Sequence, residues 1–70
     1  MKSAVLYEPT ATGDSAHVPD LPGCVGAAAT LDEARELMKE AIEDHLECMR
    51  EFGYAIPKPT TVAEEVDIRA

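Results

Sequence analysis

The residues with the stoichiometry of a zinc site are two histidines and two cysteines: His17, Cys24, His45 and Cys48. His45 and Cys48 stand three residues apart in a helical pattern, so both could reach one metal ion. His17 alternates with Ala16 and Val18. If those two face a helix, His17 points to the opposite sheet face. No C-x-x-C pair is present, so we expect no metal site, with His45 half-buried and the cysteines acting as small hydrophobic residues.

Carboxylates near strand ends could instead serve a two-metal nuclease, and the acids at such positions are Glu8, Asp14 and Asp67. A nuclease site needs several carboxylates to converge on one sheet face. The formal net charge of −8 would also repel a polynucleotide substrate. Cys24 has apolar neighbours and no assignable base, which argues against a cysteine nucleophile. We therefore expect a protein that is not an enzyme and that needs no cofactor.

The length and charge of the chain narrow its class. Residues 1–70 form a single domain with a small core, because so short a chain buries only about 60% of its unfolded surface. Fourteen acids against six bases argue against direct nucleic-acid binding and favour a basic protein partner, although acidic surfaces also serve solubility. We find no membrane span and no signal peptide. The expected location is the cytoplasm, where the cysteines stay reduced.

Three stretches are typical of strands: residues 2–8, 15–18 and 24–29. Residues 9–14 are rich in turn formers and predict a hairpin loop between the first two strands. Pro19 and Pro22 fix φ, and Gly23 tolerates a positive φ, so a tight turn should separate the second strand from the third. The first strand has apolar residues on both faces, which indicates that both faces are covered.

A long helix follows, because Thr30 and Glu33 have the spacing of a capping box and Gly53 stands where a left-handed C-cap belongs. Between them, apolar residues recur every three or four positions: Ala34, Met38, Ala41, Ile42, His45, Leu46 and Met49. Two prolines make residues 56–60 an extended connection. Residues 62–68 then predict a short last strand, with Val66 and Ile68 on one face and Glu65, Asp67 and Arg69 on the other.

The predicted fold is therefore α+β, in the order β-β-β-α-β, with one long helix on one face of a three-stranded antiparallel sheet and a short last strand. The other sheet face and the sheet edges stay open. A second copy could pack there, so we expect a homodimer or a tetramer built as a dimer of dimers.

The exterior of the predicted helix carries eight acids against three bases. Like charges four residues apart, as in Glu40 with Asp44 or Glu43 with Glu47, destabilise an isolated helix. This arrangement suggests a binding role, although a solvated acidic face is the commoner explanation. The candidate partner-binding residues are four helix acids and two loop acids: Glu36, Glu40, Glu43, Glu47, Asp14 and Asp20.

The chain resembles the HicB-type antitoxin family. The resemblance covers nearly all of it and rests on Pro-Asp-Leu-Pro-Gly-Cys at residues 19–24, followed by Thr-Leu-Asp-Glu-Ala at residues 30–34 and a P-x-P connection at residues 57–59. The family's turn and cap residues match here at six positions: Pro19, Pro22, Gly23, Thr30, Glu33 and Gly53. The run Gly-Ala-Ala-Ala at residues 26–29 departs from the more polar approach to the helix that is usual in the family, so contacts made there are not carried over.

The resemblance implies a partial ribonuclease-H-like fold, oligomeric assembly, and neutralisation of a small basic HicA-type toxin that cleaves mRNA. Longer members carry a C-terminal DNA-binding domain. Because the sequence reaches only Ala70, operator binding is not expected of it. The alternative is an orphan HicB-like structural or binding module with no toxin partner. A neighbouring reading frame for a small basic protein would separate the two hypotheses.

Overall fold

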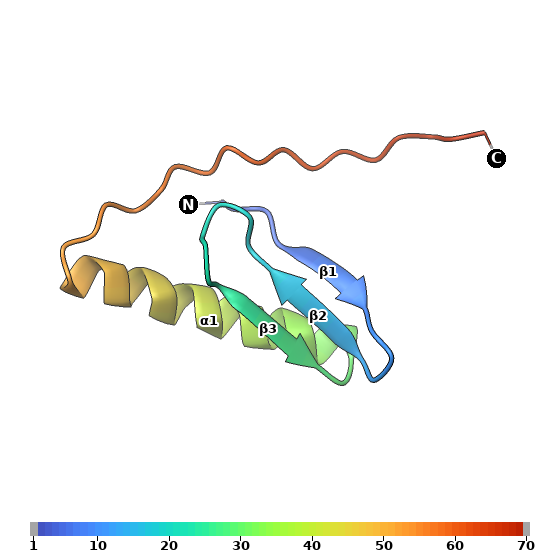
Figure 1. Cartoon of the computed structure of the whole chain (residues 1–70), viewed down its shortest axis with the longest axis horizontal. Coiled ribbons are helices and arrows are strands. Elements are labelled where there is room, and N and C mark those ends of the chain that lie inside the picture. Colours follow the sequence, from blue (N-terminus) through green and yellow to red (C-terminus); the bar gives the residue numbers. More distant parts are fainter. Residues whose placement is uncertain (1, 70) are drawn as a thin grey trace.

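Three short strands and one long helix make up the fold. The computed structural model describes residues 2–69, with the elements in the order β1 (Leu6–Pro9), β2 (Asp14–His17), β3 (Val25–Ala28) and α1 (Leu31–Glu51). The strands form one antiparallel sheet in the order β1-β2-β3, and α1 packs on β3 and β2 (Figure 1). The α+β class and the predicted β-β-β-α order are confirmed.

The strand register decides which side chains face the helix. Two adjacent rows run across the sheet, the first formed by Tyr7, Ala16 and Gly26 and the second by Leu6, His17 and Val25. Ala16 is buried, so the first row faces α1. Because side chains alternate along a strand, the second row faces away from the helix. His17 therefore lies on the open face of the sheet, as predicted.

The core is small and sits between the sheet and the first half of α1. Its buried residues are Ala16, Val18, Leu21, Cys24, Ala34 and Met38. Leu21 comes from the proline-bounded turn, where the Leu21 amide donates to the Val18 carbonyl and the Cys24 amide donates to the Leu21 carbonyl. Gly23 has a φ of +84°, a conformation that glycine adopts without a steric penalty. The turn thus closes one end of the core with a leucine side chain.

The small residues of β3 let the helix approach the sheet closely. A Cβ on Gly26 would lie 3.0 Å from Met38 Sδ and 3.1 Å from Leu37 Cδ2, so these two side chains would have to shift to make room for it. A second close approach lies at Gly13 in the β1–β2 loop, where a Cβ would collide with the Ala28 carbonyl oxygen. Close packing at the two ends of β3 therefore explains why positions 13 and 26 hold residues without a side chain.

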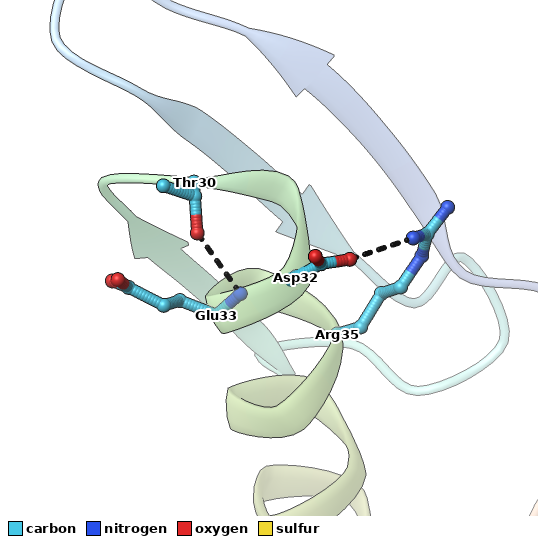
Figure 2. Close-up of polar contacts among 4 residues, drawn as sticks. All are labelled: Thr30, Asp32, Glu33 and Arg35. Atoms are coloured by element: carbon cyan, nitrogen blue, oxygen red, sulfur yellow. Dashed lines mark hydrogen bonds and ion pairs between the residues drawn. The ribbon is translucent and has the colours of Figure 1, made fainter.

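Both predicted ends of the helix are confirmed. The Glu33 amide donates to Thr30 Oγ1 at 3.2 Å, with Thr30 in an extended conformation (Figure 2). The Glu33 side chain extends away from this bond in Figure 2, so only one half of the predicted capping box is formed. At the other end, Gly53 has a φ of +74° and its amide donates to the Arg50 carbonyl. The Tyr54 amide donates to the Met49 carbonyl, which completes a Schellman motif.

Two strand predictions were wrong: one in its bounds and one in the existence of the strand. The first strand covers Leu6–Pro9 rather than residues 2–8, and residues 62–68 are not paired with any strand in the part of the chain that the structure describes. The missing last strand has a physical reason: Thr60 and Thr61 are held beside the β2–β3 turn by hydrogen bonds to Asp20, and the chain then runs past the sheet as an extended tail (Figure 1). Residues 62–69 are called the tail below.

Candidate partner-binding surface

The outer side of α1 is uniformly acidic. Residues three or four positions apart lie on the same side of a helix, and seven acids follow one another in this way: Glu33, Glu36, Glu40, Glu43, Asp44, Glu47 and Glu51. All seven side chains are exposed. Lys39, three positions from Glu36, and Arg50, three positions from Glu47, border this side of the helix. These seven residues are called the acidic face. The predicted residues Glu36, Glu40, Glu43 and Glu47 all belong to it.

The bases of the helix lie along one border of the acidic face, the border farther from Leu37. Arg35, Lys39 and Arg50 have helical spacing with Ile42 and Leu46, which pack against the core. Arg35 also forms an ion pair with the eighth helix acid, Asp32, with 3.1 Å between the guanidinium and the carboxylate (Figure 2). Both side chains are exposed, so the pair adds little to stability. The charges of α1 are therefore unevenly distributed, with carboxylates alone on one side and both signs of charge on the other.

The acidic face borders strand β3. Leu37 lies directly over Gly26 of β3 and separates the buried stripe of α1 from Glu40 and Asp44. Leu37 is 39% exposed, and Val25 at the start of β3 is 65% exposed. β3 is an edge strand and has no charged residue or proline to block pairing with another chain. The surface thus combines an open strand edge and two exposed apolar side chains with a run of carboxylates.

The two predicted loop acids lie apart from each other. Asp14 begins β2 opposite Ala28, near the end of the sheet where α1 begins. Asp20 lies in the turn beyond the other end of β2. The structure therefore does not bring them together, and Asp20 is already engaged within the chain.

Asp20 accepts several hydrogen bonds from the segment that follows the P-x-P connection. Thr61 Oγ1 donates at 2.9 Å and Thr60 Oγ1 at 3.1 Å, while the Thr61 amide lies 3.2 and 3.3 Å from the two carboxylate oxygens. Burial raises the pKa of Asp20, but hydrogen bonds from Thr61 and then Thr60 lower it by more, so the net pKa is below its ordinary value. The carboxylate is an internal anchor for the tail, a role that the sequence analysis missed.

The residues considered for catalysis or metal binding are dispersed. Cys24 is buried in the core, and burial raises the pKa of its thiol, which disfavours the reactive thiolate. Cys48 is exposed on α1, and His17 lies on the open sheet face. Among residues 2–69, no three His, Cys, Asp or Glu side chains are grouped as metal ligands, and α1 is not apolar enough to cross a membrane. The structure therefore does not bring Cys24, Cys48 and His17 together.

Comparisons with known proteins identify a family and two relatives. The family described as "HicB_like antitoxin of bacterial toxin-antitoxin system" matches residues 5–69. A relative from Haemophilus phage HP1, described as an uncharacterized 14.9 kDa protein in the rep-hol intergenic region, is 36% identical over 90% of this chain. The match covers 47% of that relative, so the chain spans about half its length.

A second relative comes from the archaeon Archaeoglobus fulgidus and is described as a UPF0150 protein. It is 48% identical to this chain over 48 residues, which cover 67% of the chain and 70% of the relative. The family match extends from before β1 into the tail and includes the proline-bounded turn, the capped helix and the P-x-P connection. The chain belongs to the HicB-like antitoxin family of bacterial toxin–antitoxin systems.

Proposed function

We propose that this chain neutralises a small basic toxin of the HicA type, which cleaves mRNA, by binding the toxin and covering its active surface. The chain itself catalyses nothing in this proposal. Membership of the antitoxin family supports a toxin partner in general. The observation that supports a basic partner is the acidic face of α1, which presents seven exposed carboxylates, with Lys39 and Arg50 only at its border.

In this proposal the acidic face attracts the basic toxin before the two proteins make contact. Complementary charges steer two proteins into encounter and raise the association rate, and salt weakens the effect because exposed charges are screened beyond about 8 to 10 Å. Close contacts require a second kind of surface. Val25, Leu37 and the open edge of β3 lie beside the acidic face, so a strand of the toxin could pair with β3 while its basic side chains meet the carboxylates.

A direct test uses the small basic protein encoded by a neighbouring reading frame. We expect the two purified proteins to bind at low salt, and RNA cleavage by the basic protein to fall as this chain is added. RNA degradation by this chain alone in the presence of magnesium would overturn the proposal. Absence of binding at low salt would also overturn it and would favour an orphan binding module.

We also propose that the chain self-associates as a homodimer or as a dimer of dimers. Its buried core consists of six small or medium-sized side chains, which is little for a fold of this length. The sheet has an uncovered face, and both of its edges are open. Light scattering on the purified chain tests this proposal without any toxin.

A further inference from the structure

The tail has the pattern of a β-strand without a strand to pair with. Val62, Val66 and Ile68 lie on one side of the extended backbone, with Glu64 between the first two, and are 78%, 72% and 82% exposed. The other side carries Glu65 and Asp67. Exposure of three β-branched side chains on one side of the tail is unfavourable in water, because burial of apolar side chains stabilises a protein. The tail therefore lacks a covering surface within the single chain.

Strand β1 has a free outer edge with which an extended segment such as the tail could pair. The Thr10 amide donates to the Gly13 carbonyl at 2.7 Å, and hydrogen-bonded pairs alternate along antiparallel strands. The next bonded pair is then Glu8 with Ser15, so the amide and carbonyl of Tyr7 point outward. Pro9 also occupies an outward position, where its missing N–H breaks no bond within the sheet.

Residues 2–5 extend this free edge. They match the part of the predicted first strand that the structure leaves unpaired. A strand laid along residues 2–9 would supply main-chain partners there.

Charge distinguishes β1 from β3 as the place where a tail docks. The tail carries Glu64, Glu65 and Asp67 against one base, Arg69. The acidic face lies beside β3 and would repel such a strand. Arg35, Lys39 and Arg50 instead share the side of α1 that carries Ile42 and Leu46, away from Leu37 and β3.

We propose that residues 62–68 of one chain pair with the outer edge of β1 in a second copy of this chain, and that the second copy returns the same contact. The tail of a single chain runs off its own sheet beyond the Asp20 anchor (Figure 1), which places it to reach another molecule. Seven residues of strand span about 23 Å, enough to cover β1 and most of residues 2–5. The exchange forms a closed, two-fold symmetric dimer. It rests on the proposed self-association and requires no toxin.

The first experiment compares two variants of the full chain by light scattering over a range of concentrations. V66D/I68D places charges on the apolar side of the tail, and E65N/D67N changes the other side as a matched control. We expect the wild type and the control to be dimers or dimers of dimers. We expect V66D/I68D to dissociate at least about 100-fold more readily, because each copy loses two buried side chains, while its helical circular dichroism stays unchanged.

The second experiment locates the contact in mixed dimers of isotope-labelled and unlabelled chains. We expect intermolecular nuclear Overhauser effects between the methyl groups of Val66 or Ile68 and the ring of Tyr7. A monomeric wild type would overturn self-association itself. A dimer in which these contacts are intramolecular, or in which the contacts between chains involve Val25 of β3 instead, would overturn only the tail exchange. Neither result would decide whether the chain binds a toxin.

Discussion

The carboxylate of Asp20 and the backbone amide of Thr61 lie 41 positions apart in the chain but are joined by hydrogen bonds of 3.2 and 3.3 Å. The Thr61 hydroxyl strengthens the contact with a bond of 2.9 Å to the same carboxylate. This contact ties the end of the P-x-P connection to the β2–β3 turn. The acid of the Pro-Asp-Leu-Pro-Gly-Cys turn thus sets the point at which the tail leaves the fold.

Replacement of Asp20 by asparagine should loosen the tail while the sheet and helix remain. The Asp20 carboxylate accepts four hydrogen bonds. Asparagine has no negative charge, and charged acceptors form stronger hydrogen bonds than neutral ones. We expect faster amide hydrogen exchange at Thr61 and earlier proteolytic cleavage near residues 57–61. D67N, a change to an exposed tail acid, is the matched control. Equal exchange rates in D20N and wild type would show that the anchor is not formed in solution.

Acidification should release the same anchor. The pKa of Asp20 is lowered below its ordinary value of 3.8 in the folded protein, so the ionised form is favoured by folding. The ionised carboxylate contributes fully to the stability of the folded state at a pH above the pKa of Asp20 in the unfolded chain. This contribution is lost as the pH falls through the lower pKa of Asp20 in the folded protein. We expect the Thr61 amide resonance to shift as the pH falls from about 5 to about 2, with a midpoint below that of an exposed aspartate. A midpoint at or above the ordinary value would contradict the prediction.

Removal of the N-cap should weaken the helix. Thr30 Oγ1 accepts from the Glu33 amide, and loss of an N-cap side chain costs about 1 kcal/mol. T30A should therefore melt roughly 4–8 °C below wild type. T30S keeps the hydroxyl and should melt close to wild type. The cap would have no role in stability if T30A and T30S melted at the same temperature.

Gly13 is expected to be intolerant of a side chain. A methyl group there would collide with the Ala28 carbonyl oxygen at the end of β3, and relieving such a collision costs about 1–3 kcal/mol. Denaturant unfolding of G13A should give a correspondingly lower free energy of unfolding. T12A, in the exposed part of the same loop, is the control and should change that free energy by less than about 0.5 kcal/mol. Similar values for G13A and T12A would mean that the loop relaxes freely.

The parts of the fold that could be predicted from the sequence depend on neighbouring residues. The Thr30 cap, the Gly53 terminus and the Gly23 turn each follow from local hydrogen bonds and allowed φ angles. Alternation between Ala16, His17 and Val18 also correctly placed His17 on the open face.

The parts that could not be predicted depend on distant residues. The sequence pattern of residues 62–68 indicates a strand, but a strand forms only where a partner edge is within reach. The Asp20 anchor, which joins residues 41 positions apart, decides where the tail goes. Asp20 looked like a surface acid because its partners, Thr60 and Thr61, carry no pattern that identifies them. The candidate site was predicted in part: four members of the acidic face were identified, but its position beside β3 depends on how Leu37 packs over Gly26.

The most direct test of the account measures the rate at which this chain associates with the neighbouring basic protein as a function of salt concentration. The variant E36Q/E40Q/E43Q/E47Q removes four charges from the acidic face. The variant E8Q/E64Q/E65Q/D67N removes four charges elsewhere, so both bring the formal net charge from −8 to the same value. Light scattering checks that each variant keeps the oligomeric state of the wild type.

We predict that the first variant associates roughly tenfold or more slowly at low salt and with a flatter salt dependence, because it loses the complementary charges that steer the encounter. The second variant should stay close to wild type. Equal slowing by the two variants would show that net charge alone acts. Wild-type rates for the first variant would contradict a role for the acidic face of α1 in toxin binding.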